Sequence, residues 1–137
     1  MAAKWLFKSD PDTYSFSDLE RDGKTVWDGV SNNLALKHLR SMRPGDQVLV
    51  YHTGDEKAVV GVAEVTRAAY PDPKQKDPKL AVVDLKARER LPRAVPLAEI
   101  KGDRAFADLA LVRIGRLSVM PASADQFQRL LKLGGAK

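Results

Sequence analysis

The segment QVLVYHTGDEKAVVGVAEVTRAA, residues 47–69, decides the fold class of this chain. Residues 47–52 alternate and are rich in Val, so they predict a strand, and residues 53–56 predict the loop of a hairpin. Residues 58–69 predict a second, longer strand that contains Gly61. A glycine inside a strand marks a bulge, a bend or a close backbone approach, which a small, partly closed barrel requires.

Toward the N-terminus, the pattern predicts a strand and two helices before the hairpin. The first helix has Ser15 as its cap and Asp18 three residues later, and Gly23 ends it. The second helix carries an apolar stripe and is stopped by the turn at residues 44–46. The expected elements are a strand over residues 4–8, a helix over 16–21, an extended piece over 25–27 and a helix from Asn32 or Asn33 to about Met42.

Toward the C-terminus, prolines and polar residues separate the remaining elements. Residues 70–78 contain Tyr70-Pro71-Asp72-Pro73 and predict a loop that cannot be a strand. Four or five strands among short helices predict an α+β domain. The elements expected here are a strand over 80–90, a helical turn over 96–100, a helical turn or short strand over 109–113, a strand over 117–120, and a helix over 124–133 capped by Ser123.

Length and composition restrict the class of protein. With 137 residues, 44% hydrophobic and 30% charged, we expect one globular domain. No apolar run approaches the roughly 20 residues that span a bilayer, and the apolar start is too short for a signal peptide, so we expect no membrane association and a cytoplasmic location. The net charge of +5 favours polyanionic partners such as nucleic acid.

Cofactor and metal chemistry find little support in the composition. The chain has no cysteine, which excludes a disulfide framework, a thiol nucleophile and a zinc ribbon. His38 and His52 are too few for most histidine-based metal sites. We therefore expect neither a metal nor a cofactor.

The loop Trp27-Asp28-Gly29-Val30-Ser31-Asn32 is the strongest candidate for a binding site. An aromatic ring, a turn-forming Asp-Gly pair and adjacent asparagines bring together the groups that bind a flat, polar ligand. The same residues also permit a simpler interpretation, in which Trp27 is a core residue and the asparagines only cap a helix.

An ordered series of motifs identifies a family. In the order of the chain they are Trp5-Leu6-Phe7-Lys8-Ser9-Asp10-Pro11 with Tyr14-Ser15, Trp27-Asp28-Gly29-Val30, Leu39-Arg40 with Met42, Gly45-Asp46, Tyr51-His52, Val60-Gly61-Val62-Ala63, Ala69-Tyr70-Pro71-Asp72, and Arg116-Leu117-Ser118-Val119 with Pro121. The chain thereby resembles the EVE domain of the PUA-like superfamily, which is close in shape to the YTH readers of methylated RNA. The resemblance implies a small twisted β-barrel of about five to six strands flanked by short helices, with a pocket for a modified nucleobase.

The chain departs from the family pattern at four positions. Ser31 stands where the family usually has Arg, and Leu36 and Lys37 replace the usual Arg and Asn. Asp10 replaces a common Glu. The Arg and Asn positions are natural phosphate or base contacts, so these changes bear on the identity of the ligand rather than on the fold.

The resemblance leads to a specific functional hypothesis. We expect a non-enzymatic module that accepts a methylated or hydroxymethylated base, first of all cytosine in DNA, with modified RNA close behind. Trp27 is the expected stacking platform, and Ser9 and Asn32 are expected to contact the edge of the base. The expected ligand-binding residues are Lys8, Ser9, Trp27, Gly29, Val30, Asn32, Tyr51, His52, Thr53, Tyr70, Asp72, Arg116, Leu117 and Ser118.

Two alternatives remain open at this point. A small hydrolase or nucleotide-ligand-binding protein would act through His52 and a nearby carboxylate. A partner-binding module would keep the pocket only as a vestige, as the replaced Arg and Asn positions allow. The sequence contains no phosphate-cradling Gly-rich loop, nucleophile elbow or His-Glu metal motif, and it says nothing of the oligomeric state.

Overall fold

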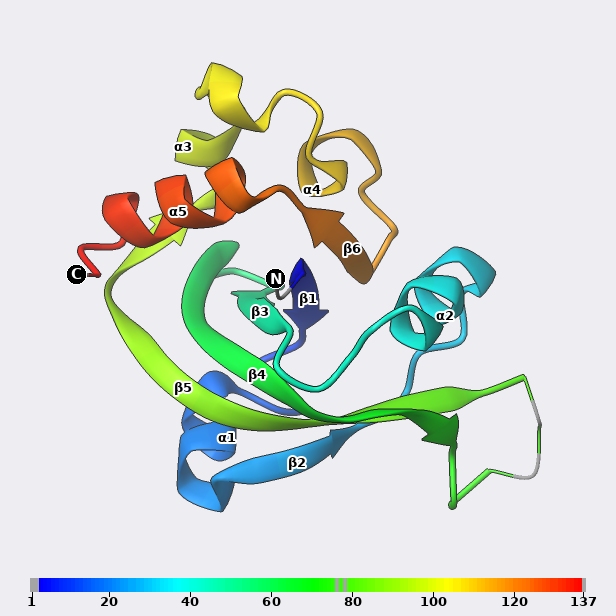
Figure 1. The fold of residues 1–137 in the computed structure, drawn as a ribbon. Helices are drawn as coiled ribbons and strands as arrows, with labels where there is room; N and C mark the ends of the chain where they lie inside the picture. The colour runs from blue at the N-terminus through cyan, green and yellow to red at the C-terminus, as the bar shows by residue number, and fades with distance from the viewer. Residues whose placement is uncertain (1–2, 76, 78, 137) are drawn as a thin grey trace.

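The strands of the computed structural model, which describes residues 3–75, 77 and 79–136, form one sheet with short helices around it (Figure 1). The strands are β1 (Lys4–Ser9), β2 (Lys24–Trp27), β3 (Gln47–His52), β4 (Ala58–Pro71), β5 (Ala81–Pro96) and β6 (Val119–Ala122). The helices are α1 (Phe16–Asp22), α2 (Asn33–Arg40), α3 (Leu97–Lys101), the 3-10 helix η1 (Arg104–Phe106), α4 (Ala110–Arg113) and α5 (Ala124–Leu133).

The sheet is mixed and strongly curved. Its strand order is β2-β5-β4-β3-β1-β6, in which β1 and β3 run parallel and the other neighbours run antiparallel. Figure 1 shows β4 and β5 as long bent ribbons, with α3, α4 and α5 together at one end and α1 at the other. Within the described residues the edge strands β2 and β6 do not pair, so the barrel stays open. The predicted α+β fold of the PUA-like type is confirmed.

Gly61 is the position where β4 bends and receives a neighbouring ring. The pairing register shifts between Val59 and Gly61 on the β5 side. The Phe16 ring lies over the glycine, and a Cβ built there would stand 2.5 Å from Phe16 Cζ. The predicted bulge and close approach in this strand are therefore both present, and the approaching group is a side chain of α1.

The helices are fixed by caps and by one continuous hydrophobic core. Ser15 and Ser123 each complete a capping box at the start of α1 and α5, as their spacing predicts. Phe16 and Leu19 bring α1 onto the sheet, and Phe127 and Leu130 do the same for α5. None of the described helices is both long and apolar enough to cross a membrane.

Two boundaries differ from the sequence prediction. Tyr70 and Pro71 belong to β4, where Pro71 pairs with Ala81, although we expected a loop from Tyr70. Beyond Val65, β4 pairs with β5 alone, so a proline there removes no bond to a second neighbour. The predicted loop therefore begins at Asp72, and its positions 76 and 78 lie outside the described residues.

The strand β5 also extends further than predicted. This strand continues past Pro92 to Pro96, whereas its predicted end was residue 90. Gly61 pairs with Arg90 and Val59 pairs with Val95, so the residues around Pro92 leave the regular ladder. The irregularity accommodates the missing N–H of the proline. The segment 109–113, for which a helical turn or a short strand was predicted, forms the helix α4. The last strand, β6, begins two residues later than expected.

The contact between Gly61 and Phe16 predicts a large effect of a small substitution. Gly61→Ala should lower the free energy of unfolding by about 1–3 kcal/mol, because the added methyl overlaps the Phe16 ring. Gly102→Ala is the matched control, since a Cβ there would lie at an ordinary contact distance of 3.6 Å from the Ala98 carbonyl oxygen. Urea unfolding of both variants measures the difference. Equal midpoints for the two variants would contradict this account of the bend.

Candidate functional site

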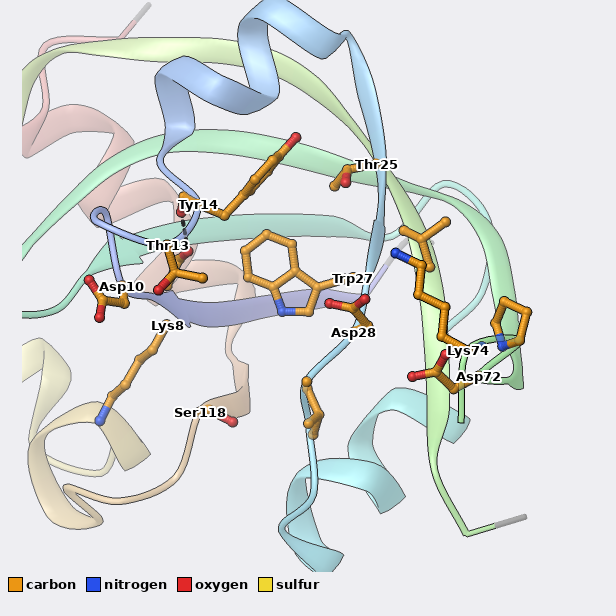
Figure 2. Close-up of a pocket in the computed structure, with 15 residues that line it drawn as sticks. Lys8, Asp10, Thr13, Tyr14, Thr25, Trp27, Asp28, Asp72, Lys74 and Ser118 are labelled. Carbon is orange, nitrogen blue, oxygen red and sulfur yellow. Dashed lines mark hydrogen bonds between the residues drawn. The ribbon is translucent and has the colours of Figure 1, made fainter. Parts of the chain in front are cut away.

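An open cavity of about 630 Å³ lies beside the C-terminal end of β1. Its walls come from four parts of the chain that are distant in sequence: the end of β1 with the following turn, β2 with the loop after it, the loop after β4, and Ser118 just before β6 (Figure 2). The lining residues are Lys8, Ser9, Asp10, Thr13, Tyr14, Thr25, Val26, Trp27, Asp28, Gly29, Val30, Asp72, Pro73, Lys74 and Ser118. We call this space the first cavity.

Trp27 is both a core residue and a wall of the first cavity. Only 9% of its surface is exposed, and its ring lies 5.3 Å from that of Phe7, centroid to centroid. The Tyr14 ring meets it edge-on at 6.4 Å. Packing on these sides holds the indole in one orientation, so the part that borders the cavity is preorganised.

The indole N–H of Trp27 has no hydrogen-bond partner among the described residues. The other tryptophan, Trp5, is equally buried, and its indole N–H donates to Asp46 Oδ2 at 3.0 Å. All fully buried side-chain nitrogens and oxygens in the described part of the chain are hydrogen-bonded, so the Trp27 N–H must retain access to the cavity. It is therefore a donor available to a ligand.

The loop after β2 is shaped by Gly29 and Asn32. Gly29 has a φ of 79°, the left-handed conformation that the Asp-Gly pair predicts. Asn32 Oδ1 accepts from the backbone N–H groups of Leu34 and Ala35 at 2.9 and 3.1 Å. Asn32 thus caps α2 through its side-chain oxygen, and it lies outside the set of residues described for the first cavity.

Three carboxylates line the first cavity, together with the amines of Lys8 and Lys74. Asp10 Oδ1 accepts from the Asp12 N–H, and Asp72 Oδ1 accepts from the Lys74 N–H, both at 2.9 Å. These contacts fix the two carboxylates and leave each with a second oxygen. Asp28 is exposed at the mouth of the cavity. The rim therefore offers several hydrogen-bond acceptors in defined positions.

Ser9 and Tyr14 have structural partners as well as places in the cavity wall. The Ser9 hydroxyl donates to the Tyr14 carbonyl, and the Ser9 carbonyl accepts from the Thr53 N–H at 2.9 Å. The Tyr14 hydroxyl donates to Asp22 Oδ2 at 2.9 Å, and burial raises the pKa of Tyr14. The Ser9 proton is engaged, so Ser9 can meet a ligand only as an acceptor.

His52 is a structural residue. Its Nε2 accepts from the backbone N–H of Phe16 at 3.0 Å, and its Nδ1 lies 2.6 Å from Glu56 Oε1. A backbone N–H can only donate, so Nδ1 carries the ring proton and shares it with Glu56. The histidine–carboxylate pair that a hydrolase would need is present, but neither ring nitrogen is left to take a proton from a substrate.

The remaining predicted residues are distributed over other parts of the molecule. Tyr51 and Thr53 line a second cavity of about 230 Å³, which also includes Lys8. The Tyr70 hydroxyl donates to Asp84, while Arg67 stacks on its ring. Arg116 is exposed and Leu117 is buried, and both lie outside the set of residues described for the first cavity.

The departures from the family pattern have clear structural consequences. Leu36 is a fully buried core residue of α2, so it cannot contact a ligand. Ser31 and Lys37 are exposed. The two positions where the family usually has Arg, Ser31 and Leu36, therefore carry no charge here, and Lys37 places a charge where the family usually has Asn.

Sequence reasoning placed Lys8, Ser9, Trp27, Gly29, Val30, Asp72 and Ser118 in the site, and all of these line the first cavity. It left out Asp10, Thr13, Tyr14, Thr25, Val26, Asp28, Pro73 and Lys74. Asp10 and Tyr14 were visible as part of the first family motif, and Asp28 lies within the candidate loop. Asp72 was expected at the site from its motif, but nothing in the sequence indicated that the same loop would also bring Pro73 and Lys74 to this cavity. The described residues include no group of His, Asp and Glu side chains arranged to hold a metal ion.

Comparison with known proteins agrees with this architecture. The model of the family described as EVE domain matches residues 3–133. A Rhodopseudomonas palustris protein solved by NMR is 40% identical, with a TM-score of 0.92 and coverage of 98% of this chain and 94% of that chain. The crystal structure of human THYN1 protein in complex with 5-methylcytosine containing DNA is 28% identical, with a TM-score of 0.91 and coverage of 99% of both chains. Human thymocyte nuclear protein 1 also matches in sequence, with 28% identity over 97% of this chain and 74% of its own length.

The hydrogen bonds of His52 predict a loss of stability when the ring nitrogens are removed. His52→Phe should lower the free energy of unfolding by about 1–3 kcal/mol, because the buried Phe16 N–H loses its acceptor. Glu56→Gln is the control: its side chain is 44% exposed, and the expected change is below about 1 kcal/mol. Urea denaturation measures both variants. If His52→Phe were as stable as the wild type, the structural role of His52 would be wrong.

Proposed function

The chain belongs to the EVE domain family, and on that basis we propose that it is a non-enzymatic module that holds a modified nucleobase of a nucleic acid in the first cavity. One observation carries the proposal: a buried, immobilised indole borders an open cavity, and its N–H has no partner among the described residues. Such a donor is satisfied when a ligand with an acceptor enters. The cavity volume of about 630 Å³ lies within the roughly 300–1,000 Å³ typical of ligand pockets.

The shape of the first cavity suits a flat ring. Tyr14, Trp27, Val30 and Pro73 contribute apolar or aromatic surface to its walls. Because Trp27 is only 9% exposed, a base would contact the bordering part of the indole rather than cover a protruding ring. Aromatic contacts of this kind support bases that have left the helical stack, and are worth about 1–3 kcal/mol per base.

The polar rim suits an aminated base such as cytosine. Cytosine presents an exocyclic amino group as donor, together with ring and carbonyl acceptors. The carboxylates of Asp10, Asp28 and Asp72 can accept from the amino group, and the Trp27 N–H can donate to an acceptor of the base. An added 5-methyl group gains about 0.8 kcal/mol when it is buried, which corresponds to roughly fourfold tighter binding.

The comparison with human THYN1 supports a methylated base in DNA as the leading ligand. That structure contains DNA with 5-methylcytosine and resembles the present chain over 99% of both lengths. The net charge of +5 adds a general attraction to nucleic acid. Modified RNA shares the same base edges and follows as the second ligand. The engaged nitrogens of His52 favour a binding role over a hydrolytic one.

Binding of oligonucleotides to Trp27 variants tests the proposal. We expect single strands with 5-methylcytosine to bind the wild type more tightly than unmodified strands. Trp27→Ala should abolish that preference, with a loss of about 1–3 kcal/mol in binding. Trp27→Phe removes the free N–H while keeping a ring, and should weaken binding to the modified strand by about 1 kcal/mol. Fluorescence anisotropy at low and moderate salt, with single- and double-stranded DNA and RNA, measures these differences.

Trp5→Phe provides the matched control. Trp5 is as buried as Trp27, but its N–H donates to Asp46, so this variant should lose stability and keep its affinity for the modified strand. Thermal unfolding of every variant separates loss of folding from loss of binding. A wild type that binds all strands equally, with a dependence on salt alone, would reject the proposal.

A further inference from the structure

The second cavity lies on the other side of Lys8 from Trp27. Its volume is about 230 Å³, and it is lined by Lys8, Tyr51, Thr53, Gly54, Lys57, Leu97, Lys101, Leu111, Val112 and Gly115. Three of these residues are lysines, and none of the described lining residues is acidic. Figure 2 shows the Lys8 side chain extending away from Trp27, and its amine donates to the carbonyl of Gly115, which lines the second cavity. The two cavities therefore share a wall and differ in charge.

Tyr51 contributes an unsatisfied hydroxyl to the second cavity. The residue is only 4% exposed, and its hydroxyl has no hydrogen-bond partner among the described residues. Every fully buried side-chain nitrogen or oxygen in that part of the chain has a partner, so the hydroxyl must open onto the cavity that Tyr51 lines. Burial raises the pKa of Tyr51, which keeps the group protonated and able to donate.

The lysines around this hydroxyl are available to an anion. Lys8 Nζ donates to the Gly115 carbonyl at 2.7 Å, which positions the amine and uses one of its three protons. Burial lowers the pKa of Lys8, as expected for a cation that lacks an anionic partner. In the described part of the chain, Lys57 and Lys101 form no ion pair with a carboxylate. All three positive charges can therefore act on one ligand.

The backbone at Lys57 also indicates a constrained site. Lys57 has a φ of 45°, the left-handed region that a lysine adopts only at an energetic cost. Its carbonyl accepts from the Leu97 N–H at 2.7 Å, which ties the end of the β3–β4 loop to the start of α3. This bond brings the segments that carry Lys57 and Lys101 to the same cavity.

Because the two cavities differ in charge, each suits a different part of a nucleotide. The first cavity carries the carboxylates of Asp10, Asp28 and Asp72 beside the amines of Lys8 and Lys74, so it offers acceptors to base amino groups and attracts a phosphate less than the second cavity does. The second has only cations and a neutral donor, which is the donor set that a phosphate requires. Lys8 lines both, so a base and a neighbouring phosphate of one strand can occupy the two cavities together.

We propose that the second cavity binds a backbone phosphate of the strand whose modified base occupies the first cavity, with Tyr51, Lys8, Lys57 and Lys101 as donors. This inference rests on the proposed function, because it takes the base cavity as the site of the same strand. It assigns Tyr51 and Thr53, which were expected from the sequence to be among the residues that bind the base, to recognition of the phosphate.

The test uses a short single strand with 5-methylcytosine, compared with the same strand in which the phosphodiesters flanking that base are uncharged methylphosphonates. The variants are Tyr51→Phe, the double variant Lys57→Gln/Lys101→Gln, and Lys24→Gln, which removes one exposed charge outside both sets of lining residues. For the wild type, methylphosphonate should weaken binding roughly tenfold. Tyr51→Phe and the double variant should bind the natural strand less tightly by a similar factor and lose most of the sensitivity to methylphosphonate. The double variant should also bind with a weaker dependence on salt: the negative slope of log K against log salt should become smaller in magnitude by about 0.7, the value for one phosphate contact.

Lys24→Gln should behave as the wild type toward both strands. If methylphosphonate has no effect while the preference for 5-methylcytosine persists and depends on Trp27, the phosphate inference is wrong and the proposed function stands. If no strand binds and inorganic phosphate alone shifts the amide NMR signals of Tyr51, Thr53 and Gly54, the cavity takes free phosphate, and both the inference and the proposed function are rejected. Thermal unfolding of each variant confirms that the altered residues, and not a loss of folding, cause the differences.

Discussion

The parallel pairing of β1 with β3 is the constraint on which both cavities depend. It sets Lys8 opposite Tyr51 and Ser9 opposite His52, and the Thr53 N–H extends it by donating to the Ser9 carbonyl at 2.9 Å. Both strands end at the same place, so the turn after β1 and the loop after β3 begin side by side. Paired residues face the same side of a sheet. Lys8 and Tyr51 therefore reach the second cavity together, while Ser9 contributes to the first and His52 holds the first turn of α1 through the Phe16 N–H.

The two tryptophans are similarly buried but differ in the hydrogen bond of the indole N–H. Trp5 donates to Asp46, whose carboxylate also accepts from the Ala3 and Arg43 N–H groups, and this network fixes the start of β1 against the turn before β3. Trp27 is as well packed but has no acceptor among the described residues. Its N–H opens onto the first cavity, so a ligand that supplies an acceptor can take that hydrogen bond. The difference separates Trp5, whose N–H is used within the fold, from Trp27, whose N–H is available to a ligand.

The sequence predicted the fold well because local signals and the order of motifs agree. The capping boxes at Ser15 and Ser123 and the alternation in residues 47–52 each depend on neighbours a few residues away. The errors lie where tertiary pairing overrides a local signal. Pro71 was expected to exclude a strand, but it sits where β4 has one neighbour, and the strand expected to end at residue 90 continues past Pro92, which sits in an irregular part of the ladder. The first cavity was only half predicted, because Lys74 reaches it through a loop whose path no spacing rule describes.

The acidic rim of the first cavity sets the kind of selectivity that the proposed function implies. Burying one methyl group yields roughly fourfold selectivity, whereas pairing a carboxylate with the wrong partner costs much more. A base with an amino group at the edge satisfies an aspartate acceptor, but a base with a carbonyl there places two acceptors against each other. Discrimination between aminated and carbonyl-bearing bases should therefore exceed discrimination between methylated and unmethylated cytosine. Affinity would come from cations elsewhere, since phosphate contacts position a strand and base contacts specify it. The first cavity has three aspartates beside Lys8 and Lys74, whereas the second has three lysines and no carboxylate among its described lining residues, and this difference fits the two roles.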